Sequence, residues 1–194
     1  MGAVSEGYAD AYAGRFWGDL SASLGRVGSG YLLAVIPGVA LGLASGRSPA
    51  LASLLSPIIN GVRAVPGISW LPLALLWLGI GFRATVSLIA LAGFFPAYLN
   101  AAAGAASVPP VLIRAGRMLG FGRRAIFFRV VIPSAMPQVR TGLRVALGMS
   151  FSYLVLGELT GVPDGLGAMI MDARLAGRVD LLVSGIILIA LVGW

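Results

Sequence analysis

Histidine, lysine and cysteine are absent from the 194-residue sequence, and all fourteen of its basic residues are arginines. These absences exclude cysteine nucleophiles, histidine bases, disulfide bonds and metal sites built from His or Cys. A GxxxxGK[ST] phosphate-binding loop is also missing from the sequence. We therefore expect that this chain hydrolyses nothing, has no catalytic residue and holds no metal or cofactor of its own.

Charged residues are scarce, at 11% of the chain, whereas 58% of the residues are hydrophobic. Soluble domains average about 25% charged residues, so this composition predicts an all-α fold, a polytopic bundle of transmembrane helices. The net charge of +7 is then expected to lie in loops, where it sets membrane topology. No soluble domain is present to carry a nucleic-acid site, and we expect no nucleic-acid partner.

Carboxylates are missing from the whole middle of the chain, between Asp19 and Glu158, although eleven arginines fall in that interval. Ion-driven transporters use carboxylates or histidines within their spans as proton relays. Their absence here argues against that class of transporter.

Apolar segments predict four membrane crossings and a partial fifth. They are residues 21–46, a broken segment 50–65 with 68–81, then 84–104, 135–157 and 181–194. About 20 residues are needed to cross the hydrocarbon core, so the last run is short and the sequence is expected to stop within a helix. Residues 1–20 are predicted to form an external interfacial segment, and residues 21–194 a single transmembrane domain.

The segment 105–133 carries five arginines and no acidic residue between these apolar stretches. Short loops rich in arginine stay in the cytoplasm. This loop is therefore predicted to be cytoplasmic, which places the N-terminus and the 160–180 loop on the external side.

Proline and glycine give the loop a predicted shape. Pro109-Pro110 marks a helix start, Gly120 is suited to a left-handed cap, and Gly122 opens a second short segment that Pro133 is expected to stop. On a helical wheel one arc of the first helix is apolar: Val111, Leu112, Ala115, Met118 and Leu119. Arg114 and Arg117 lie off this arc, with Ile113 as the one apolar residue on their side.

Two interpretations of this loop remain open from the residues alone. A basic loop beside a membrane binds anionic lipid, at about 1 kcal/mol per arginine, and the chain would then be a membrane scaffold. A partner protein would also explain why the loop is built of an apolar helix and a glycine turn at defined spacing.

The loop resembles the signature of ABC importer permeases, EAA-x3-G-x9-I-x-L-P. Gly120 and Pro133 match it in register, whereas Arg114 stands in place of the glutamate; the other matching positions are Ala115, Gly116, Val130 and Ile132. Four further blocks, at 63–82, 94–110, 141–148 and 157–174, are similar to permeases of the aliphatic sulfonate, nitrate and taurine importer family. The resemblance covers roughly residues 20–194, and members of that family usually have a further N-terminal span.

The resemblance implies a type I ABC importer transmembrane domain in a bacterial inner membrane, working as a homodimer. A separate cytoplasmic subunit would bind ATP and Mg²⁺, and an external solute-binding protein would deliver the solute. The implied solute is a small anion such as a sulfonate, nitrate, taurine or bicarbonate, with a vitamin precursor as the alternative. The coupling residues it implies are Arg114, Ala115, Gly116, Arg117, Gly120, Phe121, Gly122, Arg123, Arg124 and Pro133.

Few polar groups lie within the spans, and these are the candidates for a solute pathway or gate: Asn60, Arg63, Ser69, Asn100, Ser150, Tyr153 and Glu158. Hydrogen bonds between helices are the ordinary explanation for such residues. Arg63 would attract an anion if it faces the pathway; otherwise it snorkels to the inner surface. Glu158 is expected to act as a gate or binding-protein contact, or else to be an interfacial carboxylate pointing to water.

Overall fold

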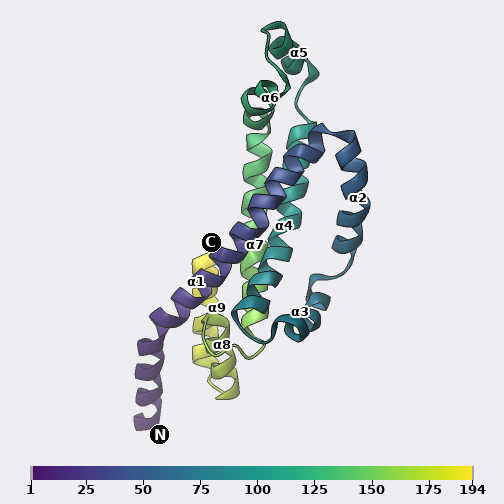
Figure 1. The fold of residues 1–194 in the computed structure, drawn as a ribbon. Helices are drawn as coiled ribbons and strands as arrows, with labels where there is room; N and C mark the ends of the chain where they lie inside the picture. Colours follow the sequence, from purple (N-terminus) through teal and green to yellow (C-terminus); the bar gives the residue numbers. More distant parts are fainter. Residues whose placement is uncertain (1, 194) are drawn as a thin grey trace. The chain divides into compact units, whose positions relative to one another are not determined.

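The computed structural model describes the backbone of residues 2–193 and the side chains of residues 14–191 and 193. Every regular element in this range is helical, which confirms the predicted all-α fold (Figure 1). The predicted interfacial segment 1–20 forms the start of the first helix rather than a separate element, and its side chains before residue 14 lie outside the described residues.

The helices follow the predicted segments closely. Their bounds are α1 Gly2–Arg47, α2 Pro49–Ala64, η1 Gly67–Trp70, α3 Leu71–Leu78, α4 Phe82–Ala106, α5 Pro110–Met118, α6 Arg123–Ile126, η2 Phe127–Val131, α7 Ile132–Glu158, α8 Leu166–Leu175 and α9 Val179–Gly193.

The helices form two compact units. Unit 1 comprises the residues up to Gly30, Ile68–Ile89 and the residues from Ser150 onward, and unit 2 comprises Tyr31–Gly67 and Ala90–Met149.

Local signals explain where several helices begin. The Ser48 hydroxyl accepts a hydrogen bond from the Leu51 backbone N–H at 3.3 Å, and Pro49 opens α2. A serine N-cap followed by proline in the first turn is a strong helix start. Pro110 opens α5 in the same way, as predicted.

Two described helices are long and apolar enough to cross a membrane, the Gly14–Arg47 part of α1 and the whole of α4. A third crossing results if α2 and the Gly67–Leu78 segment, which meet at an angle of 88°, count as one broken span. α7 has 27 residues, and about 20 suffice to cross, but Gln138, Arg140 and Arg144 lie in its first half. α9 is a shorter apolar helix.

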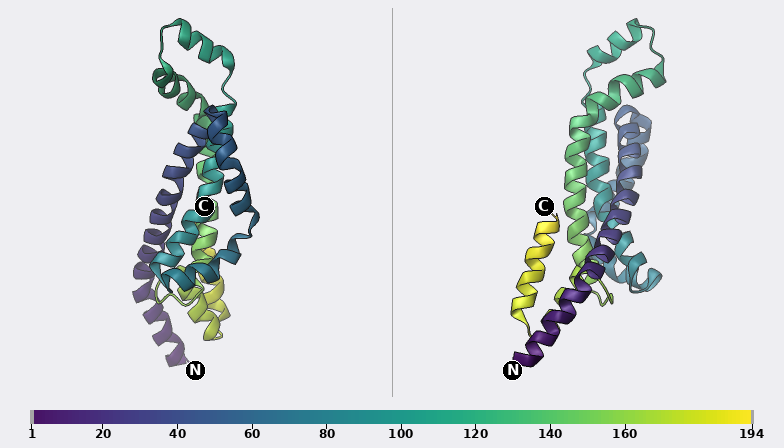
Figure 2. Two further views of the ribbon diagram at one scale, coloured as in Figure 1. Left: turned by 45° about the vertical axis from the view of Figure 1, so that its right-hand side comes forward. Right: turned by 90° about the vertical axis from the view of Figure 1, so that its left-hand side faces the viewer.

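Unit 2 is held together by small residues of α1 that lie against α4 (Figures 1 and 2). A Cβ added at Gly42 would lie 2.5 Å from the backbone oxygen of Tyr98, and one at Gly46 would lie 2.3 Å from that of Ala102. Glycine at these positions lets the two backbones approach closely, as the four-residue spacing in the sequence indicates. Next to this contact the Ser45 and Tyr98 hydroxyls share a buried hydrogen bond of 2.8 Å.

Unit 1 contains two smaller apolar clusters. One joins Val27 of α1, Ile89 of α4 and Leu154 of α7. The other joins Ala74 of α3 to Ala84 and Leu88 of α4. The α8 and α9 helices also pack on each other in this unit.

The prediction that Pro133 stops the second loop segment before the next span is wrong. Backbone helix runs without a break from α6 through η2 into α7, and Pro133 is the second residue of α7. Proline removes one N–H and crowds the carbonyl four residues earlier. The wider π-helical turn η2, which immediately precedes α7, accommodates this change without ending the helix.

Candidate functional site

The loop between α4 and α7 folds as two short helices joined by a glycine turn, all within unit 2. The Phe121 backbone N–H donates to the Gly116 oxygen, and the Gly120 N–H donates to the Arg117 oxygen, both at 3.0 Å. Gly120 has a φ of +79°. These two hydrogen bonds and the left-handed glycine form a Schellman motif, which confirms the predicted cap at the end of α5.

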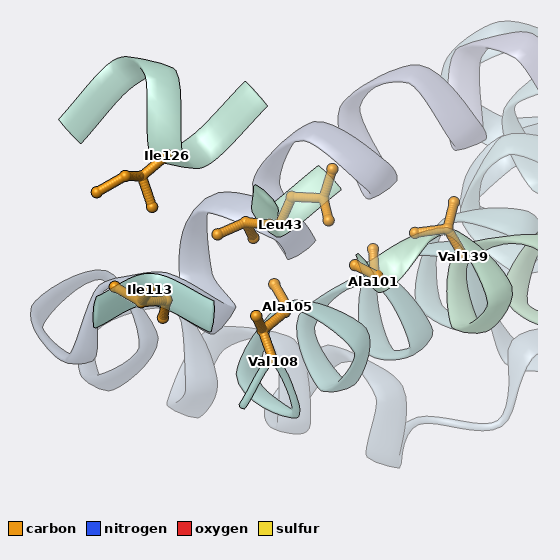
Figure 3. Close-up of a cluster of buried hydrophobic side chains, with 9 residues drawn as sticks. Leu43, Ala101, Ala105, Val108, Ile113, Ile126 and Val139 are labelled. Atoms are coloured by element: carbon orange, nitrogen blue, oxygen red, sulfur yellow. The ribbon is translucent and has the colours of Figure 1, made fainter. Parts of the chain in front are cut away.

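Ile113 and Ile126 anchor the two loop helices to the rest of unit 2. Both are buried in one cluster with Leu43 of α1, Ala105 of α4 and other small apolar residues (Figure 3). Ile113 was the one apolar residue expected on the arginine side of α5. Its burial explains this exception, because Ile113 and Gly116 are the buried residues of α5, whereas Arg114 and Arg117 are exposed.

The apolar arc of α5 is therefore turned away from the cluster and exposed. Met118 and Leu119 expose 90% and 73% of their surfaces, and Val111 and Leu112 expose 57% and 43%. Four arginines are exposed around this arc: Arg114, Arg117, Arg123 and Arg124. None of these guanidinium groups forms an ion pair with a side chain in the described part of the chain.

Phe121 and Arg129 complete the turn. Phe121 is half-buried, and the Arg129 guanidinium carbon lies 5.4 Å from the centre of its ring. This cation–π contact and the isoleucine anchors hold the turn on η2. The loop thus presents a fixed surface that is apolar at its centre and basic at its rim. We call Val111, Leu112, Met118, Leu119 and the four exposed arginines the α5 surface.

A buried ion pair joins α1 to the end of α7 within unit 1. Arg26 Nη1 lies 2.8 Å from Glu158 Oε1, and only 4% and 1% of these two residues are exposed. The hydroxyl of Ser23 donates to Glu158 Oε1 at 2.7 Å. Arg26 also pairs with the Asp164 carboxylate and donates to the Asp164 backbone oxygen at 2.9 Å. A buried charge is tolerated only when it is paired in this way.

The same side chains cap the N-terminus of α8. Three consecutive backbone N–H groups donate to α1 and α7: Gly165 to Asp19 Oδ1 at 2.9 Å, Leu166 to Ser23 Oγ at 2.9 Å and Gly167 to Glu158 Oε2 at 2.8 Å. The first N–H groups of a helix lack partners within it, and carboxylates there oppose the helix dipole favourably. α8 thus begins on side chains that two other helices supply.

Glycine is required where this carboxylate meets the start of α8. Gly165 has a φ of +116°, and a Cβ added to it would lie 2.5 Å from Glu158 Oε1. A Cβ on Gly167 would lie 2.6 Å from the Cβ of Glu158. The network therefore needs both the charged side chains and the Gly165-Leu166-Gly167 sequence.

Of the alternatives for Glu158, the interfacial carboxylate that points to water is wrong, because the side chain is enclosed by Ser23, Arg26 and the start of α8. The role of Glu158 as a gate or binding-protein contact stays a prediction. Sequence reasoning missed Asp19, Ser23 and Arg26 as its partners. Their spacing of four and three residues, which places them on one face of a helix, was the available signal.

The other pathway candidates are distributed over both units. In unit 2, Asn60 and Arg63 are exposed on α2, and Asn100 Oδ1 accepts a hydrogen bond from Gln138 Nε2 at 3.1 Å. In unit 1, Ser69 is exposed and Tyr153 packs against both apolar clusters. Ser150 is fully buried, and its hydroxyl has no partner among the described residues. The pathway role of these residues stays a prediction.

Comparison with known proteins identifies the family. Residues 38–194 match the model of the family described as "Binding-protein-dependent transport system inner membrane component". The chain is 39% identical over 189 residues to the taurine transport system permease protein TauC of Escherichia coli K12, covering 97% of this chain and 68% of that protein. It is 35% identical to the putative aliphatic sulfonates transport permease protein SsuC of Bacillus subtilis 168, covering 93% and 66%.

A third relative, the nitrate import permease protein NrtB of Leptolyngbya laminosa, is 34% identical, covering 93% of this chain and 64% of that protein. The chain thus spans about two thirds of the length of these curated relatives. A solved structure of the MetNI methionine ABC transporter in an inward-facing conformation has the same fold, with a TM-score of 0.80, 19% identity and coverage of 94% and 91%. This chain belongs to the family of inner membrane components of binding-protein-dependent transport systems.

Proposed function

We propose that this chain is the permease subunit of an ATP-driven importer for a small anion. In this proposal the chain forms the membrane path but hydrolyses no nucleotide. A separate cytoplasmic subunit binds ATP and Mg²⁺, and it docks on the α5 surface. An external solute-binding protein delivers the solute, and two copies of the chain assemble around the path.

The α5 surface is the observation that carries this proposal. Met118 and Leu119 are apolar, yet most of their surface is exposed. The loop that carries them is anchored by the buried side chains of Ile113 and Ile126. Apolar centres with arginine rims are typical of protein interfaces. The unpaired arginines favour a partner that carries carboxylates, and anionic lipid is a further neighbour for them.

Two observations favour an anionic solute. The relatives are named for taurine and aliphatic sulfonates, which carry a negatively charged sulfonate group, and for nitrate, which is an anion. Unit 2 contains nine arginines and no carboxylate (residues 31–67 and 90–149). An excess of one charge sign raises the local concentration of the opposite ion.

Replacing Gly120 by proline tests the docking. Proline fixes φ near −65°, so it cannot adopt the +79° of this position, and the turn that presents Met118 and Leu119 must change. We expect the variant to insert into membranes normally but to lose the ATP-hydrolysing subunit when it is purified in mild detergent. The readout is the molar ratio of the two subunits.

Gly122→Ala is the matched control, because Gly122 has a φ of −68° and no atom lies within 4 Å of an added Cβ. This variant should keep its ATPase subunit. Normal recovery of the ATPase with Gly120→Pro would contradict the proposed docking. Wild-type chain that purifies alone would instead favour a lipid-binding scaffold.

A further inference from the structure

α2 has three chemically different faces, although only one of them is packed in unit 2. Ile59 is its one buried residue. Leu54 and Ile58 expose 64% and 59% of their surfaces on a second face, as suits contact with lipid tails. The third face is also exposed but polar, with Ser53, Ser56, Asn60 and Arg63 at intervals of three, four and three residues. This interval places all four on one side of the helix.

Arg63 lies near the end of α2, far from the start of that helix. α2 begins beside the ends of α1 and α4, where Ser45–Arg47, Pro49 and Ala102 line one hollow, and it runs back alongside α4 (Figure 2). This end of unit 2 also leads into the arginine-rich loop, which belongs to the cytoplasmic side. Arg63 is fourteen residues beyond Pro49, so it lies about 21 Å, or about four helical turns, from the start of α2. Snorkelling to the inner surface does not span this distance.

Exposure to lipid is therefore the wrong environment for this face. Arginine facing hydrocarbon is strongly unfavourable, and intramembrane arginines face a water-filled cavity or a partner charge. Unit 2 supplies no carboxylate, and Arg63 has no ion-pair or hydrogen-bond partner among the described side chains. Asn60 donates to the Ser56 hydroxyl at 3.1 Å, so the neighbouring polar groups leave the guanidinium free.

We propose that the face formed by Ser53, Ser56, Asn60 and Arg63 lines a water-filled path, and that Arg63 binds the anion that passes along it. A guanidinium presents planar N–H donors that match the oxygens of a sulfonate, nitrate or carboxylate. The serine hydroxyls and the asparagine amide offer weaker donors along the same line. The proposal deepens the proposed function, on which it rests for the transport of an anion.

The absence of cysteine permits a direct test in the assembled transporter in membrane vesicles. Single cysteines are placed at Ser56 and Asn60 on the polar face, and at Leu54 and Ile58 on the apolar face as matched controls. A thiol in an apolar environment stays protonated and unreactive, whereas a hydrated one reacts. We expect small charged methanethiosulfonates to label positions 56 and 60 and to leave positions 54 and 58 unlabelled.

Arg63 is tested by the charge of the reagent. In the Asn60→Cys variant, the ratio of labelling rates for a sulfonatoethyl and a trimethylammonioethyl reagent reports the local preference for an anionic sulfonate. Arg63→Gln should lower this ratio by about tenfold, because a neighbouring charge concentrates the opposite ion, whereas Arg63→Lys should largely preserve it. An unchanged ratio in Arg63→Gln would overturn the anion site.

Equal labelling on both faces of α2 would overturn the path. The labelling pattern and the ratio of labelling rates are both independent of the ATPase subunit. If the α5 surface proves not to bind the ATPase, the proposed function is therefore refuted, but the expected labelling pattern is unchanged.

Discussion

Arg26→Ala is expected to be among the most destabilising single substitutions in unit 1. It removes the cation that pairs with Glu158 at 2.8 Å, and it leaves that carboxylate buried at 1% exposure. Breaking a buried ion pair from one side costs about 3–5 kcal/mol. We expect a large fall in the midpoint of denaturation in detergent and a low yield of folded protein.

Arg15→Ala is the matched control for this result. Arg15 also belongs to α1, but it pairs with Asp172 at 3.9 Å, and both side chains are at least half exposed. Exposed pairs of this kind contribute about 0–1 kcal/mol, so its midpoint should stay close to that of the wild type. Equal midpoints for the two alanine variants would show that the buried pair contributes no more to stability than the exposed pair does.

Met118→Asp combined with Leu119→Asp should weaken docking of the ATP-hydrolysing subunit by about a hundredfold or more, because each apolar side chain buried in an interface contributes about 1.5–3 kcal/mol. Both side chains are exposed in the chain itself, so folding should be unaffected. The affinity of the purified chain for the ATPase measures this effect.

Leu175→Asp serves as the control for this pair of substitutions. Leu175 exposes 76% of its surface at the end of α8, outside the loop between α4 and α7. It should leave the affinity for the ATPase unchanged. Equal losses of affinity in the two variants would mean that added negative charge, and not the α5 surface, weakens the complex.

Local signals in the sequence were sufficient for most helix boundaries and for the loop turn. Pro110 and Gly120 act on the residues beside them, through fixed φ and a left-handed cap, and the structure confirms both. Pro133 was misjudged because its effect depends on the preceding turn. The π-helical η2 absorbs the proline, and nothing in the residue types alone indicated it.

Partners in the buried network could not be identified from one sequence. Arg26 and Glu158 are 132 residues apart, and Ser23 and Leu166 are 143 apart. Without knowledge of which helices pack together, Arg26 could not be identified as a partner, and Glu158 was interpreted as a gate, a binding-protein contact or an interfacial carboxylate. The helix α8, which lies within the loop 160–180, was not predicted from the sequence; it buries Leu166 and Ala173.

Labelling of a single cysteine at Met118 tests most directly whether the α5 surface is the contact with the ATPase. The chain has no other cysteine, and this position is 90% exposed, so a maleimide should label it rapidly in the chain alone. In the purified complex with the ATP-hydrolysing subunit, we expect labelling at position 118 to be blocked, whereas Leu175→Cys should react equally in both states. Unchanged labelling at position 118 within an assembled complex would contradict this expectation.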